Sequence, residues 1–111
     1  MIHLAFLLAI AEPTSAQVLG YGTNSCGSYV ATRSQPVARD VYITWLTGFL
    51  TEFNISNRQG ILDASAHTDG LGIQAWLDTY CTANPLVPFA TASLALLADL
   101  VAQERRAQIS K

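Results

Sequence analysis

Two cysteines, Cys26 and Cys81, set the strongest limit on how this chain folds, because they are the only two in its 111 residues. An exported chain with an even number of cysteines most simply pairs them, and two cysteines allow one connectivity within a monomer. The bond would close a loop of about 55 residues and stabilise the domain by about 4 kcal/mol, which is comparable to the net stability of a small domain. Two free thiols, or a bond between two chains, are the alternatives.

The first sixteen residues indicate whether the chain is exported, and therefore whether its two cysteines are expected to form a disulfide. The chain opens with MIHLAFLLAIA, apolar apart from His3, and continues through a proline to a small-residue ending at Ala16. This is typical of a secretory signal peptide, and the apolar run is shorter than the roughly 20 residues that span a membrane. A leading region without Lys or Arg is atypical, and a buried N-terminal helix is the alternative. We expect residues 1–16 to be a signal peptide and residues 17–111 to be a single helical domain, periplasmic or secreted, without membrane insertion after cleavage.

The charges beyond residue 16 nearly balance. Eight acidic side chains less Glu12 leave seven, against six from Lys and Arg. Arg105 and Arg106 are the only adjacent basic pair. Nucleic acids and anionic membranes are therefore not expected as partners, because binding to either needs clustered cations.

Apolar residues recur at helical spacing after Pro36, which is tolerated in a first helical turn. One row, with an apolar residue at every fourth position, comprises Val37, Val41, Trp45, Phe49 and Phe53, and a row beside it comprises Tyr42, Leu46 and Leu50. The pattern predicts one broad amphipathic helix. Gly48 lies near the face of Trp45, and we expect it to mark a close helix crossing.

Three further helices are predicted. Asn24 or Ser25 can cap a short helix that contains Cys26, and Thr68 or Asp69 can cap a third helix. The apolar residues expected to face the core of this third helix are Leu71, Trp76, Leu77, Tyr80 and Cys81. Asn84-Pro85 is expected to start the last helix, whose apolar row comprises Phe89, Ala92, Leu96, Leu97, Leu100 and Val101. Because no alternating strand pattern accompanies them, we predict an all-α fold, a small four-helix bundle.

Residues 54–68 form a predicted connector, with Ile61 and Leu62 expected to pin its middle to the core. Candidate ligands alternate in and just after it: Asp63, Ser65, His67 and Asp69. No register supplies both the glycine and the final glutamate of a calcium loop, and a transition metal would lack a fourth ligand. A catalytic triad needs side chains that converge from separate elements, which residues two positions apart in one connector do not provide. A catalytic cysteine is also not expected, because Cys26 or Cys81 would then not be free to form the disulfide. We therefore expect that the protein has no catalytic residue, metal or cofactor and is not an enzyme.

Two other features are weaker. Asn54-Ile55-Ser56 matches a glycosylation motif, which matters only in a eukaryotic secretory pathway. Trp45 and Trp76 could anchor a partner surface, but at helical spacing among apolar residues we interpret them as core. The sequence identifies no partner surface.

Three segments, SCGSYVATR, WLTGFLTEFN and AWLDTYCTANPL, together resemble a group of small exported proteobacterial proteins. Their helical scaffold is similar to that of the HdeA acid-stress chaperones and of the periplasmic immunity proteins that block type VI secretion amidases. The resemblance implies a Cys26–Cys81 bridge, a helical periplasmic protein and action by binding another protein rather than by catalysis. An immunity or inhibitor protein against a periplasmic toxin or hydrolase is the alternative function, and a homodimer is left open.

Overall fold

The computed structural model describes residues 17–57 and 63–110, so the predicted signal peptide and the contacts predicted for Ile61 and Leu62 lie outside the described residues. Within these two ranges the chain forms a short 3-10 helix and four α-helices, and no strand. The elements are η1 (Gly20–Thr23), α2 (Cys26–Val30), α3 (Pro36–Ser56), α4 (Gly70–Ala83) and α5 (Phe89–Ile109). The predicted all-α class is confirmed.

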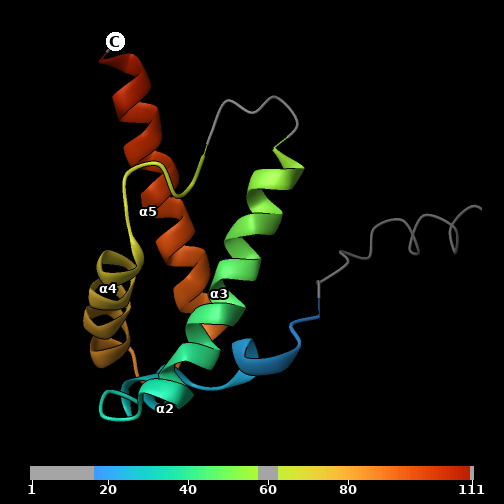
Figure 1. The fold of residues 1–111 in the computed structure, drawn as a ribbon, viewed down its shortest axis with the longest axis vertical. Helices are drawn as coiled ribbons and strands as arrows, with labels where there is room; N and C mark the ends of the chain where they lie inside the picture. The colour runs from blue at the N-terminus through green and yellow to red at the C-terminus, as the bar shows by residue number, and fades with distance from the viewer. Residues whose placement is uncertain (1–16, 58–62, 111) are drawn as a thin grey trace, which may run out of the picture.

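The two long helices, α3 and α5, start from one base, where α2 and η1 also lie (Figure 1). They run in the same direction, because α4 returns the chain to the base before α5 begins. In this view α3 and α5 spread apart toward their C-terminal ends, while α4 lies on the side of α5 away from α3. The helices are therefore most closely assembled at the base.

A disulfide between Cys26 and Cys81 holds the base together, with Cα atoms 4.8 Å apart and both side chains fully buried. It joins the start of α2 to the end of α4. Backbone hydrogen bonds reinforce the junction: the amide of Cys26 donates to the carbonyl of Val87 at 2.8 Å, and that of Phe89 donates to Asn24 at 2.7 Å. The five-residue helix α2 is thus fixed covalently and by its backbone.

Phe89 is the centre of an aromatic cluster just above this junction. Its ring is fully buried and lies 5.1 Å from the Tyr29 ring, 5.1 Å from the Tyr42 ring and 5.9 Å from the Trp45 ring, centroid to centroid. Tilted and edge-on contacts of this kind are favourable because the ring edge is positive and the face negative. Phe89 thereby joins α5 to α2 and α3.

The structure confirms several of the predicted helix boundaries. Ser25 caps α2 by accepting a hydrogen bond from the amide of Ser28 at 3.1 Å, and Asp69 caps α4 by accepting from Gly72 at 2.8 Å. Pro36 is the first residue of α3. Each cap satisfies an amide that has no partner within its helix.

The predicted start of the last helix at Asn84-Pro85 is wrong, because α5 begins at Phe89. The carbonyls of Pro85 and Val87 instead accept hydrogen bonds from the amides of Gly27 and Cys26. The chain stays non-helical there because its backbone groups are used by α2.

The predicted buried faces of α3 and α4 are partly wrong. In α3 the second apolar row is buried, whereas Val37, in the first row, is 82% exposed. Gly48 marks no close crossing, since a Cβ there would meet no atom of another described element within 4 Å. In α4, Leu71 is 78% exposed, while Leu77 and Cys81 are fully buried. α3 carries more apolar surface than its neighbours cover.

Candidate protein-binding groove

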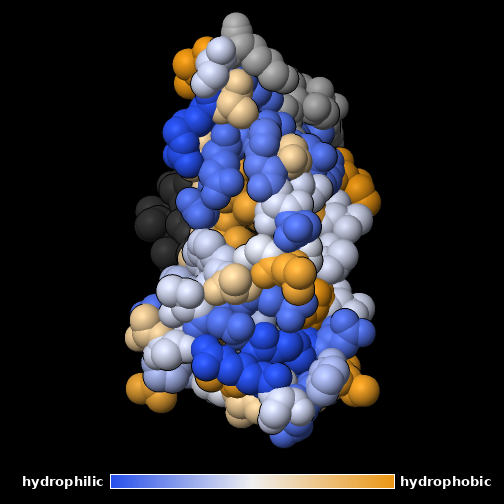
Figure 2. Space-filling model, turned by 60° about the vertical axis from the view of Figure 1, so that its left-hand side comes forward, coloured by the Kyte–Doolittle hydropathy of each residue, from blue (hydrophilic) through white to orange (hydrophobic). Residues whose placement is uncertain are grey.

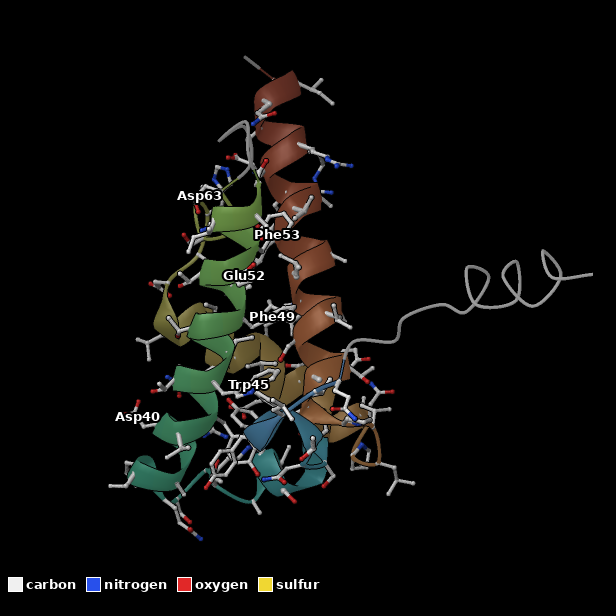
Figure 3. All side chains as sticks on the ribbon, turned by 90° about the vertical axis from the view of Figure 1, so that its right-hand side faces the viewer. Asp40, Trp45, Phe49, Glu52, Phe53 and Asp63 are labelled. Carbon is white, nitrogen blue, oxygen red and sulfur yellow. A yellow bond between two sulfur atoms is a disulfide. The ribbon has the colours of Figure 1, made fainter. Side chains whose placement is uncertain are left out.

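Trp45, Phe49 and Phe53 form an aromatic wall on the side of α3 that faces α5 (Figure 3). They follow one another at intervals of four residues and so share one helix face. All three are half-buried and pack against the core from its edge. The Trp45 and Phe49 rings are nearly parallel, with centroids 6.1 Å apart. The wall therefore presents three aromatic side chains in a row, each partly covered by the core.

The lower part of this wall borders a hollow of about 490 Å³ between α3, α5 and the N-terminal stretch. Its lining comprises Gln17, Val18, Leu19, Trp45, Phe49, Ala90 and Leu94. Leu19 and Leu94 are 73% and 58% exposed. The indole nitrogen of Trp45 donates to the carbonyl of Leu19 at 2.9 Å, which fixes the N-terminal stretch against the wall. Gly22 permits the fit, because a Cβ there would overlap the Trp45 ring.

The upper part of the wall borders a second hollow, of about 270 Å³. Its lining comprises Phe53, Ser56, Asn57, Val101 and Arg105. Along α5, residues 90, 94, 101 and 105 share one face, as residues 45, 49, 53 and 56 do along α3. The two hollows thus lie one above the other along the same two helix faces, and together they are called the α3–α5 groove below. At 1.5 Å per residue, it is about 18 Å long from Trp45 to Asn57.

The groove changes from apolar to charged along its length. None of the described residues that line the lower hollow is charged. At the upper end Arg105 lines the α5 side, and on the α3 side Glu52 accepts a hydrogen bond from Ser56 at 2.6 Å. Both charged residues are exposed, and neither forms an ion pair with another described residue. A ligand in the upper hollow would therefore contact Arg105 on the α5 edge, and on the α3 edge it would lie beside Glu52, which is bonded to the lining residue Ser56.

Trp76, the second candidate anchor, lies in a different setting on α4. Its ring stacks on Tyr80 with centroids 5.1 Å apart, and its indole nitrogen donates to Asp99 at 3.1 Å. The described residues that line the hollow beside it, about 540 Å³ in volume, all belong to α4: Gly72, Ala75, Trp76, Thr79 and Tyr80. The view that brings the α4 side forward shows a surface with a broad hydrophilic area and apolar patches (Figure 2). Since one helix cannot enclose a ligand, this surface is a weaker candidate than the groove.

A polar cluster at the base joins α2, α3 and α4. The Arg39 guanidinium donates to both carboxylate oxygens of Asp78, at 3.1 and 2.7 Å, and lies 4.5 Å from the centroid of the Tyr29 ring. The Asp78 carboxylate raises the pKa of Arg39. Burial raises the pKa of Tyr29 to about 12, and its hydroxyl has no hydrogen-bond partner among the described residues. Because its charges are paired across elements, we interpret this cluster as structural.

The residues considered as metal ligands do not converge. Asp63 accepts hydrogen bonds from the amide and hydroxyl of Ser65, at 2.9 and 2.6 Å, and these bonds lower the pKa of Asp63. His67 pairs with Glu104 at 2.8 Å, and Asp69 caps α4. Among residues 17–57 and 63–110, no three His, Cys, Asp or Glu side chains are grouped to hold a metal ion.

Asn54, in the glycosylation motif, makes structural contacts with the connector. Its amide nitrogen donates to the Asp63 carboxylate at 3.1 Å, and its amide oxygen accepts from the Ala64 backbone at 3.0 Å. Ala64 is buried, so Asn54 ties the connector to α3.

Comparison with known proteins gives no match to any family model, curated protein or solved structure. The resemblance to HdeA and immunity-protein scaffolds therefore stays a prediction. In the part of the chain that the structure describes, no helix has the length and apolar character needed to cross a membrane. Sequence reasoning missed the groove because it placed Trp45 in the core. The available signal was the width of the apolar face of α3, which exceeds what one neighbouring helix can cover.

Proposed function

We propose that this chain is an exported, non-catalytic protein that acts by binding another protein through the α3–α5 groove. The observation that carries the proposal is the half-buried pair of Trp45 and Phe49 between the exposed side chains of Leu19 and Leu94. Binding energy concentrates at aromatic anchors in concave, water-excluding sites. The groove is the one surface described above that combines such anchors with walls from two helices.

Export is supported by the disulfide and by the predicted signal peptide. A structural disulfide is rare in a reducing cytosol, because thiols are kept reduced there. The mass of the protein recovered from the source organism would test this part of the proposal. A mass corresponding to residues 17–111 is expected, and a mass that includes Met1 to Ala16 would contradict it.

Inhibition of a periplasmic toxin or hydrolase would be one form of this binding. It would require the groove, or a surface beside it, to block an enzyme's active site.

Photo-crosslinking in the source organism tests the binding surface. A photoreactive amino acid at Leu94, in the groove, is expected to give a discrete adduct of higher mass. The same amino acid at Thr79, exposed on α4, is the matched control and is expected to give none. Absence of an adduct from Leu94, or the same adduct from both positions, would contradict the groove as the binding surface.

A further inference from the structure

We infer that the partner segment in the α3–α5 groove is an amphipathic helix with oppositely charged flanks, a basic one beside Glu52 and an acidic one beside Arg105. This inference rests on the proposed function and specifies the partner at the same site. It follows from three properties of the groove: its shape, the spacing of its two hollows and the charges on its edges.

The shape of the groove suits a helix. α3 and α5 run in the same direction and spread apart toward their C-terminal ends, and the two hollows lie between them. A third helix can lay its apolar face into a furrow of this kind between two helices. The wall on α3 is aromatic, whereas the wall on α5 is built from smaller residues, Ala90, Leu94 and Val101. A groove about 18 Å long matches about 12 helical residues. An inserted helix would therefore contact both walls over about three turns.

The two hollows define where the apolar anchors of that helix lie. Judged by the α3 residues that line them, the lower hollow is centred between Trp45 and Phe49, and the upper hollow between Phe53 and Asn57. Eight residues along α3 separate these centres, which corresponds to about 12 Å, or about two helical turns. Large apolar side chains at positions i and i+7 of a partner helix are about 10.5 Å apart along its axis, which is close to this spacing, and position i+4 faces the seam between them.

The charges on the edges specify the flanks. Glu52 on α3 and Arg105 on α5 are exposed and have no oppositely charged partner among the described residues. A helix with two basic flanks would be repelled by Arg105, and one with two acidic flanks would be repelled by Glu52. A helix with one flank of each sign meets attraction on both sides. Complementarity of this kind selects partners more than it adds affinity.

The experiment measures binding of labelled 16-residue peptides to the purified, disulfide-bonded protein by fluorescence anisotropy. The reference peptide carries leucines at i, i+4 and i+7, lysines along one flank and glutamates along the other. A second peptide has lysines on both flanks, and a third has the reference composition with a central proline that breaks the helix. We expect the reference peptide to bind at least several-fold more tightly than either control.

Protein variants test the position of the peptide. Leu94→Asp should weaken binding of the reference peptide at least tenfold, with the unfolding midpoint as a check on folding. Glu52→Lys and Arg105→Glu should each weaken it several-fold, since each leaves two edges of the same sign. The double variant should restore binding, because a helix can enter the exchanged edges in the opposite direction. Arg105→Glu alone should improve binding of the peptide with two basic flanks.

Four results would overturn the inference. Equal binding of the reference and all-lysine peptides would remove the charge requirement, and equal binding of the proline peptide would remove the helix, while the groove would stand in both cases. Failure of every peptide, together with an adduct from Leu94, would mean that the partner is not a helix, although the proposed function holds. A protein dimer that Leu94→Asp dissociates would show that a second copy occupies the groove.

Discussion

The base and the groove contain the same kinds of aromatic and aliphatic side chain, but only the base is closed. Phe89 is surrounded by rings from α2 and α3, and the disulfide and the backbone bonds around it keep those neighbours in place. Trp45 and Phe49 have the core on one side and a hollow on the other. In so small a chain, an apolar side chain is therefore buried only where other contacts hold a second helix against it. Its apolarity alone is not enough.

Removing the covalent clamp should give the largest effect. Replacing both Cys26 and Cys81 by serine should lower the free energy of unfolding by about 4 kcal/mol, since the loop that the bond closes has about 55 residues. For a domain of this size that corresponds to a fall of roughly 20 °C in melting temperature. Calorimetry would measure it. A fall of only a few degrees would mean that the backbone pairing closes the base without the bond.

Two leucines of α5, two positions apart, compare the closed and open regions directly. Leu96 is 1% exposed and Leu94 is 58% exposed. Leu96→Ala should destabilise the protein by about 3 kcal/mol, because it leaves a cavity, whereas Leu94→Ala should change stability by less than about 0.5 kcal/mol. Urea unfolding of both variants measures the difference. Similar losses would show that the groove is part of the core and not a binding surface.

The Arg39–Asp78 ion pair at the base should contribute less to stability than the disulfide or Leu96 does. Asp78→Ala leaves the largely buried Arg39 guanidinium without its carboxylate and should cost about 2 kcal/mol, below the value for a fully buried pair. Asp40→Ala, on the exposed side of α3, is the matched control and should cost less than about 0.5 kcal/mol. Chemical unfolding at neutral pH would test both. Equal costs would show that the Arg39–Asp78 contact does not stabilise the base.

Tyr29→Phe should have the smallest effect and the opposite sign. It removes a buried hydroxyl that has no hydrogen-bond partner among the described residues, so stability at neutral pH should rise by up to about 1 kcal/mol. Burial raises the pKa of Tyr29 from 10.0 to about 12, so the folded protein holds this proton more tightly than the unfolded chain. The resulting stability is complete below pH 10 and is lost as the pH rises toward 12.

The variant lacks this titration, so its advantage over the wild type should grow above pH 10. Unfolding at a series of alkaline pH values, for both proteins, would measure that growth. A constant difference between them would mean that the Tyr29 hydroxyl has the same pKa in the folded and unfolded states.

Much of the fold could be predicted because the signals were local. Ser25 and Asp69 are hydrogen-bonding residues placed just before helical runs, and they cap α2 and α4 as expected. The start of α5 was not predictable in this way, because residues 85–88 are kept out of the helix by contacts with α2, far away in sequence. Periodicity also showed that α3 is amphipathic, but not which part of its face a neighbour covers. Trp45 was therefore assigned to the core, and the groove followed only from the positions of α5 and the N-terminal stretch.

The position of the disulfide also determines what a single proteolytic cleavage does to the protein. Any single peptide bond cut between Cys26 and Cys81 leaves two fragments that remain joined through the bond. The cut protein keeps its mass, apart from one added water, until it is reduced. Most of α3 and α4 lies within this span, so a protease that nicks them cannot release a piece of the chain by one cleavage. In a protease-rich compartment, the chain thus tolerates one cut without losing a fragment.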